Sequence, residues 1–266
     1  MEILIDELIF AADILKHPHL ERYHKQAVLF AVDLMKDPQV DINRRANIAA
    51  NILKHPHLDQ HHQEAMPFAM DLMKDPQVNI NRRADIVANI LKHSHLEQYH
   101  QEAMPFAVAL MKNKQVDINR RTNVAANILK HFHLEQYHQE AMPFAVALMK
   151  DPQVDINRRA NIADNILKND RLSLEQFSHL EQHYKKVVPF AVALMKNKQV
   201  DINRRNNIAV NILKNGILSL YHQEAAPFAV DLMKDPQVDI NLQTDIAANI
   251  LKHRYLEQYH QEAAPV

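Results

Sequence analysis

The chain has 266 residues but no cysteine, no tryptophan and only one glycine. Without cysteine, disulfides and thiolate metal sites are excluded, and the composition is compatible with a reducing intracellular compartment. The scarcity of glycine and the abundance of alanine, leucine, isoleucine and lysine favour helix over strand. We therefore expect an all-α protein in the cytoplasm.

The chain also lacks an excess of charge and a long apolar run. Lysine plus arginine (31) nearly balances aspartate plus glutamate (32), so no global field would drive non-specific binding to nucleic acid or to an anionic membrane. No stretch approaches about 18 uninterrupted apolar residues, and the first residues lack the basic start of a signal peptide. The sequence predicts a soluble protein without a membrane partner.

The main feature that is present is an internal repeat. A segment of the form DPQVDINRRANIAANILK recurs six times, and its DIN-type triplet starts at Asp41, Asn79, Asp117, Asp155, Asp201 and Asp239. These starts lie 38 residues apart except for one spacing of 46, which contains an eight-residue insertion. Such a period is typical of stacked units that cannot bury their apolar faces alone.

We predict a single elongated repeat domain over residues 1–266. Its parts are an N-terminal half-repeat 1–19, repeats 20–57, 58–95, 96–133, 134–179 with the insertion, 180–217 and 218–255, and a partial unit 256–266. The incomplete end units are expected to expose apolar residues such as Ile9, Ala12 and Leu15, which would favour self-association.

Each full repeat is predicted to contain two helices, A and B. Helix A carries a proline of the Pro105 type, where we expect a kink or a restart. Asp37 is the predicted N-cap of helix B, which is expected to run from about Pro38 to Lys54. The predicted buried arc of helix B is centred on Ile42, Ala46, Ala49 and Leu53, with Ile48 and Ile52 at its flank. We expect Gly216 to end a helix in the left-handed conformation and residues 168–186 to be irregular.

The run from Pro143 to Ala163 resembles a HEAT repeat. The resemblance is carried by Pro143 in helix A, Asp151 at the turn, Ile156 at a valine position of the family, and Ala160 and Ala163 at its small packing positions. The departure is Asn157, where the family usually has an arginine. The resemblance covers nearly the whole chain and implies a right-handed α-solenoid of about six 38-residue helix pairs. It also implies a protein-binding scaffold with helix B on the concave side.

Asparagines form a regular stripe on helix B, because Asn43, Asn47 and Asn51 recur at i, i+4 and i+8. Two interpretations remain open for these poor helix formers: a ladder between neighbouring B helices, or a clamp on the main chain of an extended peptide. Armadillo relatives carry such an array together with tryptophan, which this chain lacks. The counterparts in the predicted ligand-binding face are Asn81, Asn89, Asn119, Asn123, Asn127, Asn157, Asn161, Asn165, Asn203, Asn207 and Asn211.

A pair of arginines follows the first asparagine of five B helices. The first of each pair borders the stripe and is predicted to face a ligand: Arg44, Arg82, Arg120, Arg158 and Arg204. Arg45 lies four residues after Asp41, where a structural ion pair is expected. The arginines could select acidic side chains or follow phosphates, but the neutral net charge and the absence of neighbouring aromatic residues make nucleic acid a weak candidate.

Histidines recur as H-x-H pairs after helix B and as single residues in helix A. Two imidazoles are too few for a closed zinc site, and neighbouring pairs are expected to lie about a helix-packing distance apart. We therefore predict boundary packing and no metal or cofactor. The chain has no phosphate-binding glycine loop, cysteine nucleophile or HExxH motif, so no catalytic residue and no enzyme activity are predicted.

The sequence thus predicts a non-catalytic scaffold that binds a protein or an extended, acidic peptide through an Asn/Arg-lined concave face. Two alternatives stay open. One is phosphate or nucleic-acid binding along the arginines, and the other is a purely structural, self-associating array.

Overall fold

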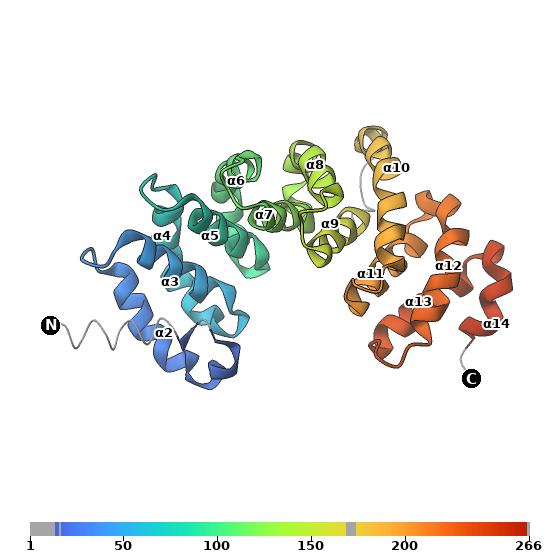
Figure 1. The fold of residues 1–266 in the computed structure, drawn as a ribbon, viewed down its shortest axis with the longest axis horizontal. Helices are drawn as coiled ribbons and strands as arrows, with labels where there is room; N and C mark the ends of the chain where they lie inside the picture. Colours follow the sequence, from blue (N-terminus) through green and yellow to red (C-terminus); the bar gives the residue numbers. More distant parts are fainter. Residues whose placement is uncertain (1–13, 16, 169–173, 265–266) are drawn as a thin grey trace. The chain divides into compact units, whose positions relative to one another are not determined.

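The structure is a computed structural model that describes residues 14–15, 17–168 and 174–264 (Figure 1). Within these ranges the regular elements are α-helices and short 3-10 helices, without strands, so the all-α prediction is confirmed. None of the helices in the described ranges combines the length and apolar character needed to cross a membrane.

The helices alternate between A and B types along the chain. The A helices are α2 (Glu21–Lys36), α4 (Asp59–Lys74), α6 (Glu97–Lys112), α8 (Glu135–Lys150), α10 (Leu174–Lys196) and α12 (Ser219–Met233). The B helices are α3 (Ile42–Lys54), α5 (Ile80–Lys92), α7 (Ile118–Lys130), α9 (Ile156–Lys168), α11 (Ile202–Lys214) and α13 (Ile240–Lys252). Short elements precede the A helices or end the chain: η1 (Pro18–Leu20), η2 (Pro56–Leu58), η3 (Ser94–Leu96), η4 (Phe132–Leu134), η5 (Gly216–Leu218), η6 (Arg254–Tyr259) and α14 (His260–Ala263).

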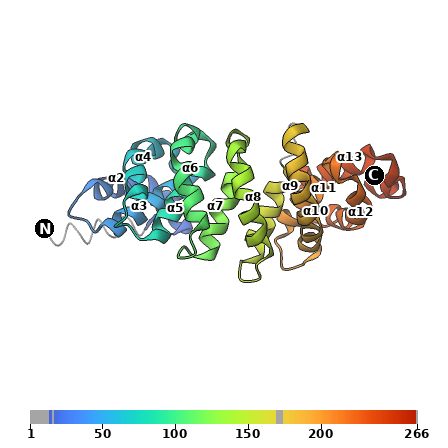
Figure 2. The same ribbon diagram turned by 90° about the horizontal axis from the view of Figure 1, so that it is seen from above.

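The chain divides into two compact units, Met1–Asn127 and Ile128–Val266. In the first unit α4 contacts both α2 and α6, and α3 contacts α5, so A and B helices form separate layers (Figure 2). In the second unit α10 contacts α8 and α12, while α11 contacts α9 and α13. Each unit is therefore a series of packed helices in two layers.

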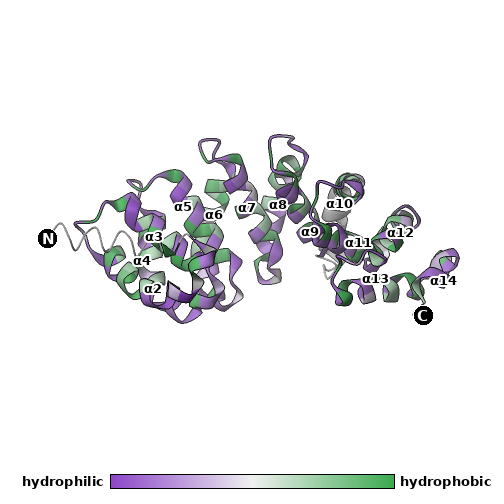
Figure 3. Ribbon diagram, turned by 60° about the horizontal axis from the view of Figure 1, so that its bottom comes forward, coloured by the Kyte–Doolittle hydropathy of each residue, from purple (hydrophilic) through white to green (hydrophobic). Residues whose placement is uncertain are grey.

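The apolar arc of helix B is broader than predicted. In α3, Ala49 and Leu53 are buried as expected, but Ile48 and Ile52 are 1% and 0% exposed, whereas Ile42 is only half-buried. Because α3 packs against α2, α4 and α5, a wide part of its surface is covered. Figure 3 shows the resulting mixture of hydrophobic and hydrophilic residues along the helices.

The start of helix B differs from the prediction. Helix α3 begins at Ile42, and the Arg44 N–H donates to Asp41 Oδ1 over 3.0 Å, so Asp41 is the N-cap. The side chain of Asp37 accepts from the Gln39 N–H over 2.8 Å in the preceding turn. Asp37 was the wrong choice because a capping oxygen must reach the second or third N–H of the helix.

A restart of helix A at its proline does not occur, because helix α4 continues through Pro67, which is exposed. Gly216 lies in η5, and the described part of the chain contains no glycine with positive φ. Of the predicted irregular stretch, residues 169–173 lie outside the described residues, and from Leu174 onward the chain belongs to the 23-residue helix α10.

The predicted exposure of the N-terminal half-repeat is not seen at Leu15, which is 0% exposed; Ile9 and Ala12 lie outside the described residues. Apolar side chains are exposed on α13 instead, where Ile240 and Leu251 are 68% and 39% exposed. Self-association through the end repeats stays a prediction.

Candidate ligand-binding face

The first asparagine of helix B joins one repeat to the next. Asn43 Oδ1 accepts from the Asn79 N–H over 2.6 Å, and Asn81 Oδ1 accepts from the Asp117 N–H over 2.7 Å. In the second unit Asn157 Oδ1 accepts from the Asp201 N–H over 2.7 Å. The donor is in each case the N-cap residue of the following B helix, so these asparagines hold the start of the next helix in register.

In three repeats the third asparagine points back to the preceding repeat. Asn89 Nδ2 donates to Ala50 O over 2.8 Å, and Asn127 Nδ2 donates to Ala88 O over 2.7 Å. Asn211 Nδ2 instead donates to the carboxylate of Asp164 over 2.6 Å. None of these three bonds joins one amide to another, as the ladder, one of the two open interpretations, would require.

In α9 a buried carboxylate, that of Asp164, stands at the position that Ala50 occupies in α3 and Ala88 in α5. Asp164 is 6% exposed and also pairs with Lys168 Nζ at 2.7 Å. Burial raises the pKa of Asp164, while Lys168 and Asn211 act in the opposite direction. This replacement explains why Asn211 has a carboxylate partner where Asn89 has a carbonyl.

The middle asparagine is the one of the three that most often lacks a hydrogen bond. Asn47, Asn161 and Asn207 are half-buried, and their side chains make no hydrogen bond within the described part of the chain. Asn123 has a partner of its own. The remaining predicted site residues are half-buried Asn51 and Asn119, buried Asn165 and exposed Asn203. The stripe therefore separates into stacking positions and a middle position that is available to a ligand.

The arginines that border the stripe differ among repeats. Arg44 is exposed and Arg82 and Arg204 are half-buried, and none of the three guanidinium groups makes a hydrogen bond in the described ranges. Arg120 Nε donates to both carboxylate oxygens of Asp85, over 2.9 and 3.0 Å, and Arg158 also has an interaction partner. Burial raises the pKa of Asp85, and Arg120 acts against that shift.

In four of the five pairs the second arginine closes the C-terminal end of helix A, whereas Arg121 Nε has no hydrogen-bond partner among the described residues. Arg45 Nε donates to Met35 O over 2.8 Å, and Arg83 Nε donates to Met73 O over 2.7 Å. The last carbonyls of a helix lack helical donors, so a neighbouring cation satisfies them well. The predicted ion pair between Arg45 and Asp41 is replaced by this carbonyl contact.

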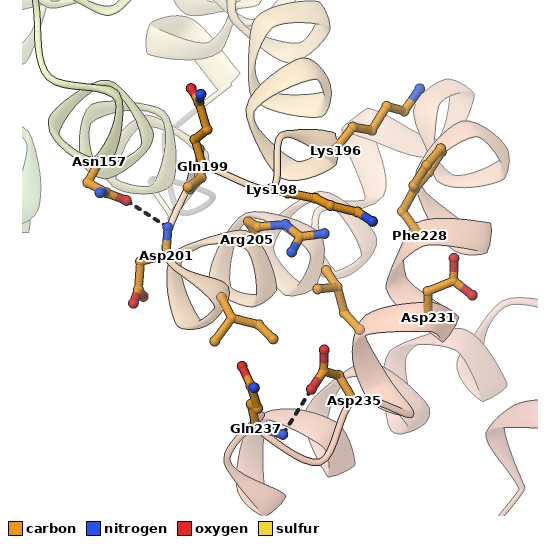
Figure 4. Close-up of a pocket in the computed structure, with 13 residues that line it drawn as sticks. Asn157, Lys196, Lys198, Gln199, Asp201, Arg205, Phe228, Asp231, Asp235 and Gln237 are labelled. Carbon is orange, nitrogen blue, oxygen red and sulfur yellow. Dashed lines mark hydrogen bonds between the residues drawn. The ribbon is translucent and has the colours of Figure 1, made fainter.

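A cleft of about 840 Å³ lies between the turns of the last two full repeats (Figure 4). Its lining contains three basic residues, Lys196, Lys198 and Arg205, and three acidic residues, Asp201, Asp231 and Asp235. Arg205 Nε is already bonded to Met195 O at 2.8 Å. The cleft therefore favours no particular charge, and the sequence did not indicate it because two separate turns form it.

The histidines pack at repeat boundaries, as predicted. His62 is 0% exposed, its Nε2–H donates to Ile52 O over 3.0 Å, and its Nδ1 lies 2.9 Å from His95 Nε2. Burial and the neighbouring His95 lower the pKa of His62. The sequence analysis considered the H-x-H pairs by themselves and missed that His62 of helix A contacts the pair His93 and His95 of its own repeat.

No family model matches the chain, and no curated protein is similar to it. The HEAT-like character of the repeats stays a prediction from their sequence.

Proposed function

We propose that the chain is a non-catalytic binding scaffold, a right-handed α-solenoid of about six HEAT-like helix pairs. It holds an acidic, extended segment of a partner protein along the B helices. The observation that supports this proposal is the division of labour on helix B. Asn43, Asn81, Asn89 and Asn127 bond to adjacent repeats, while the side chains of Asn47, Asn161 and Asn207 and the guanidinium groups of Arg44, Arg82 and Arg204 have no hydrogen-bond partner in the described ranges.

The chemistry of these free groups matches an acidic peptide. A carboxamide offers both a donor and an acceptor to a peptide main chain, and a guanidinium can form paired hydrogen bonds with a carboxylate. Packed helices lie about 8–10 Å apart, and an extended chain advances about 3.3 Å per residue. One repeat therefore addresses about three residues of the ligand.

The proposal narrows the binding residues predicted from the sequence. Its direct contacts are Arg44, Asn47, Arg82, Asn161, Arg204 and Asn207. The first and third asparagines contribute indirectly, because they set the spacing between B helices. Arg120 contributes less, because Asp85 already occupies its guanidinium group.

The test is fluorescence anisotropy with a labelled glutamate-rich peptide and a triple variant, Arg44→Gln with Arg82→Gln and Arg204→Gln. We expect binding to weaken roughly tenfold, because exposed ion pairs each contribute about 0.2–1 kcal/mol. The melting temperature should stay near that of the parent, since none of the three guanidinium groups makes a hydrogen bond within the described residues and ion pairs at the surface contribute little to stability.

A charge-matched control replaces three lysines outside this face by glutamine: Lys25, Lys114 and Lys198. It loses the same charge and should bind the peptide as the parent does. Equal weakening in both triple variants, or none in either, contradicts the proposal. A single-stranded oligonucleotide that binds more tightly than the peptide, with a steep loss of affinity on adding salt, would favour phosphate binding instead.

A further inference from the structure

Four potential metal ligands meet within the second repeat, residues 58–95, where α4 begins and α5 ends (Figure 1). Asp59 and His62 lie in the first turn of α4, and His93 and His95 flank the start of η3. The ring centroids are 5.0 Å apart for His62 and His93, 5.1 Å for His62 and His95, and 5.3 Å for His93 and His95. One ligand atom from each of the four side chains lies within 4.8 Å of the others.

The hydrogen bonds of the two buried imidazoles leave one unprotonated ring nitrogen on each. His62 Nε2–H donates to Ile52 O over 3.0 Å and to His55 O over 3.1 Å, so Nδ1 carries the lone pair. His93 Nε2–H donates to Leu53 O over 2.7 Å, which leaves its Nδ1 as the basic nitrogen. Metal-bound histidines commonly donate their other N–H to a backbone carbonyl, which fixes the ring and its tautomer.

The distances among three of the ligand atoms suit a metal ion. His62 Nδ1 lies 2.9 Å from His95 Nε2 and 3.9 Å from Asp59 Oδ1, and His95 Nε2 lies 4.0 Å from Asp59 Oδ1. A point equidistant from these three atoms lies about 2.1 Å from each, the length of a Zn–N or Zn–O bond. His93 supplies the fourth donor, so the set contains three imidazoles and one carboxylate.

The cluster is also open to solvent on one side. The side chains of His95 and Asp59 are 34% and 58% exposed, so an ion can reach the cluster from solvent.

We propose that Asp59, His62, His93 and His95 bind one divalent transition-metal ion, best matched by Zn²⁺, which joins the start of α4 to the end of α5 within the second repeat. Imidazole nitrogen and carboxylate oxygen are donors that Zn²⁺ takes in proteins without cysteine ligands. With four side-chain donors, the ion stabilises the packing of these two helix ends. A parallel cluster of His24, His55 and His57 lies in the preceding repeat.

The last full repeat keeps the hydrogen bond to the buried histidine of helix A without a set of metal ligands. There Tyr255 OH lies 2.6 Å from His222 Nδ1, in the place of His95, and Ser219 occupies the position of Asp59. A tyrosine hydroxyl donates to the buried imidazole as well as His95 does, but it is a poor ligand for zinc at neutral pH. The double variant Asp59→Ser with His95→Tyr therefore keeps the hydrogen bond and removes two metal ligands.

The experiment uses the full chain after removal of metal by a chelator. Co²⁺ is titrated while the visible absorption of a tetrahedral site is recorded, and Zn²⁺ then displaces it in competition with a chromogenic chelator. We expect one tight site in the parent chain and a higher melting temperature with Zn²⁺. The double variant should bind at least about 100-fold more weakly, because loss of even an outer contact costs about 10–100-fold.

A single variant, His61→Ala, controls for non-specific binding, because it removes an imidazole of α4 that is outside the cluster. It should keep the tight site. The proposal is overturned if the double variant keeps the parent affinity and spectrum, or if His61→Ala loses as much binding as the double variant. Should the double variant fail to fold, Zn-edge X-ray absorption of the parent decides: three imidazoles and one oxygen donor support the site, and any other ligand set overturns it.

Discussion

Replacing Asn206 by alanine is expected to stabilise the protein. Asn206 is 0% exposed in α11, and neither its Nδ2 nor its Oδ1 has a hydrogen-bond partner among the residues that the structure describes. Other repeats have alanine at this position, and Ala46, Ala84 and Ala160 are also 0% exposed. Thr122, in the third repeat, avoids the problem because its hydroxyl donates to Ile118 O over 2.8 Å.

The magnitude follows from three contributions. A buried polar group without a partner destabilises the fold by about 1–3 kcal/mol. Alanine is also a better helix former than asparagine by up to about 0.7 kcal/mol. The space left by the carboxamide offsets about 1 kcal/mol of this gain, since contacts are lost around it. We therefore expect Asn206→Ala to increase the free energy of unfolding by about 1–2 kcal/mol.

Urea unfolding followed by circular dichroism measures this change as a higher midpoint at an unchanged slope. The matched control is the reverse substitution, Ala160→Asn in α9, which should lower the midpoint by a similar amount. If Asn206→Ala is no more stable than the parent and Ala160→Asn is fully tolerated, an asparagine at this position has no cost and the argument fails.

Two further predictions concern the stripe and the histidines. Asn89→Ala should lower the free energy of unfolding by about 1 kcal/mol, because the hydrogen bond to Ala50 O is lost. Asn47→Ala should change the free energy of unfolding by less than about 0.5 kcal/mol. Equal effects of the two substitutions in urea unfolding would contradict the different roles of these asparagines. Burial lowers the pKa of His222 below its ordinary value of 6.5, so its neutral form is favoured in the folded state. The stability that neutral His222 contributes should be fully present above pH 6.5 and be lost as the pH falls toward the lowered pKa. The variant His222→Gln should therefore show a smaller drop in melting temperature than the parent between pH 7.5 and 5. An equal drop in both proteins would refute the idea that His222 causes this pH dependence.

The sequence by itself determined the features that repeat within a few residues. Apolar residues at helical spacing predict helix pairs, and the 38-residue period predicts that the pairs stack. The same spacing puts Asn43, Asn47 and Asn51 on one face, outside the apolar arc, as the structure has them. These predictions succeed because helical periodicity and burial are local properties that each segment carries by itself.

The tertiary structure decided which partner each polar group meets. Asn43 bonds to a backbone N–H 36 residues later, Arg45 bonds to the end of the preceding helix, and His62 meets His95 33 residues away. Each of these contacts depends on the offset and rotation between successive helices, and a shift of a few tenths of an ångström to one ångström would break a hydrogen bond. Side-chain packing between the helices sets that offset. A repeat pattern can therefore predict which face of a helix a residue occupies, but it cannot predict which group that residue contacts.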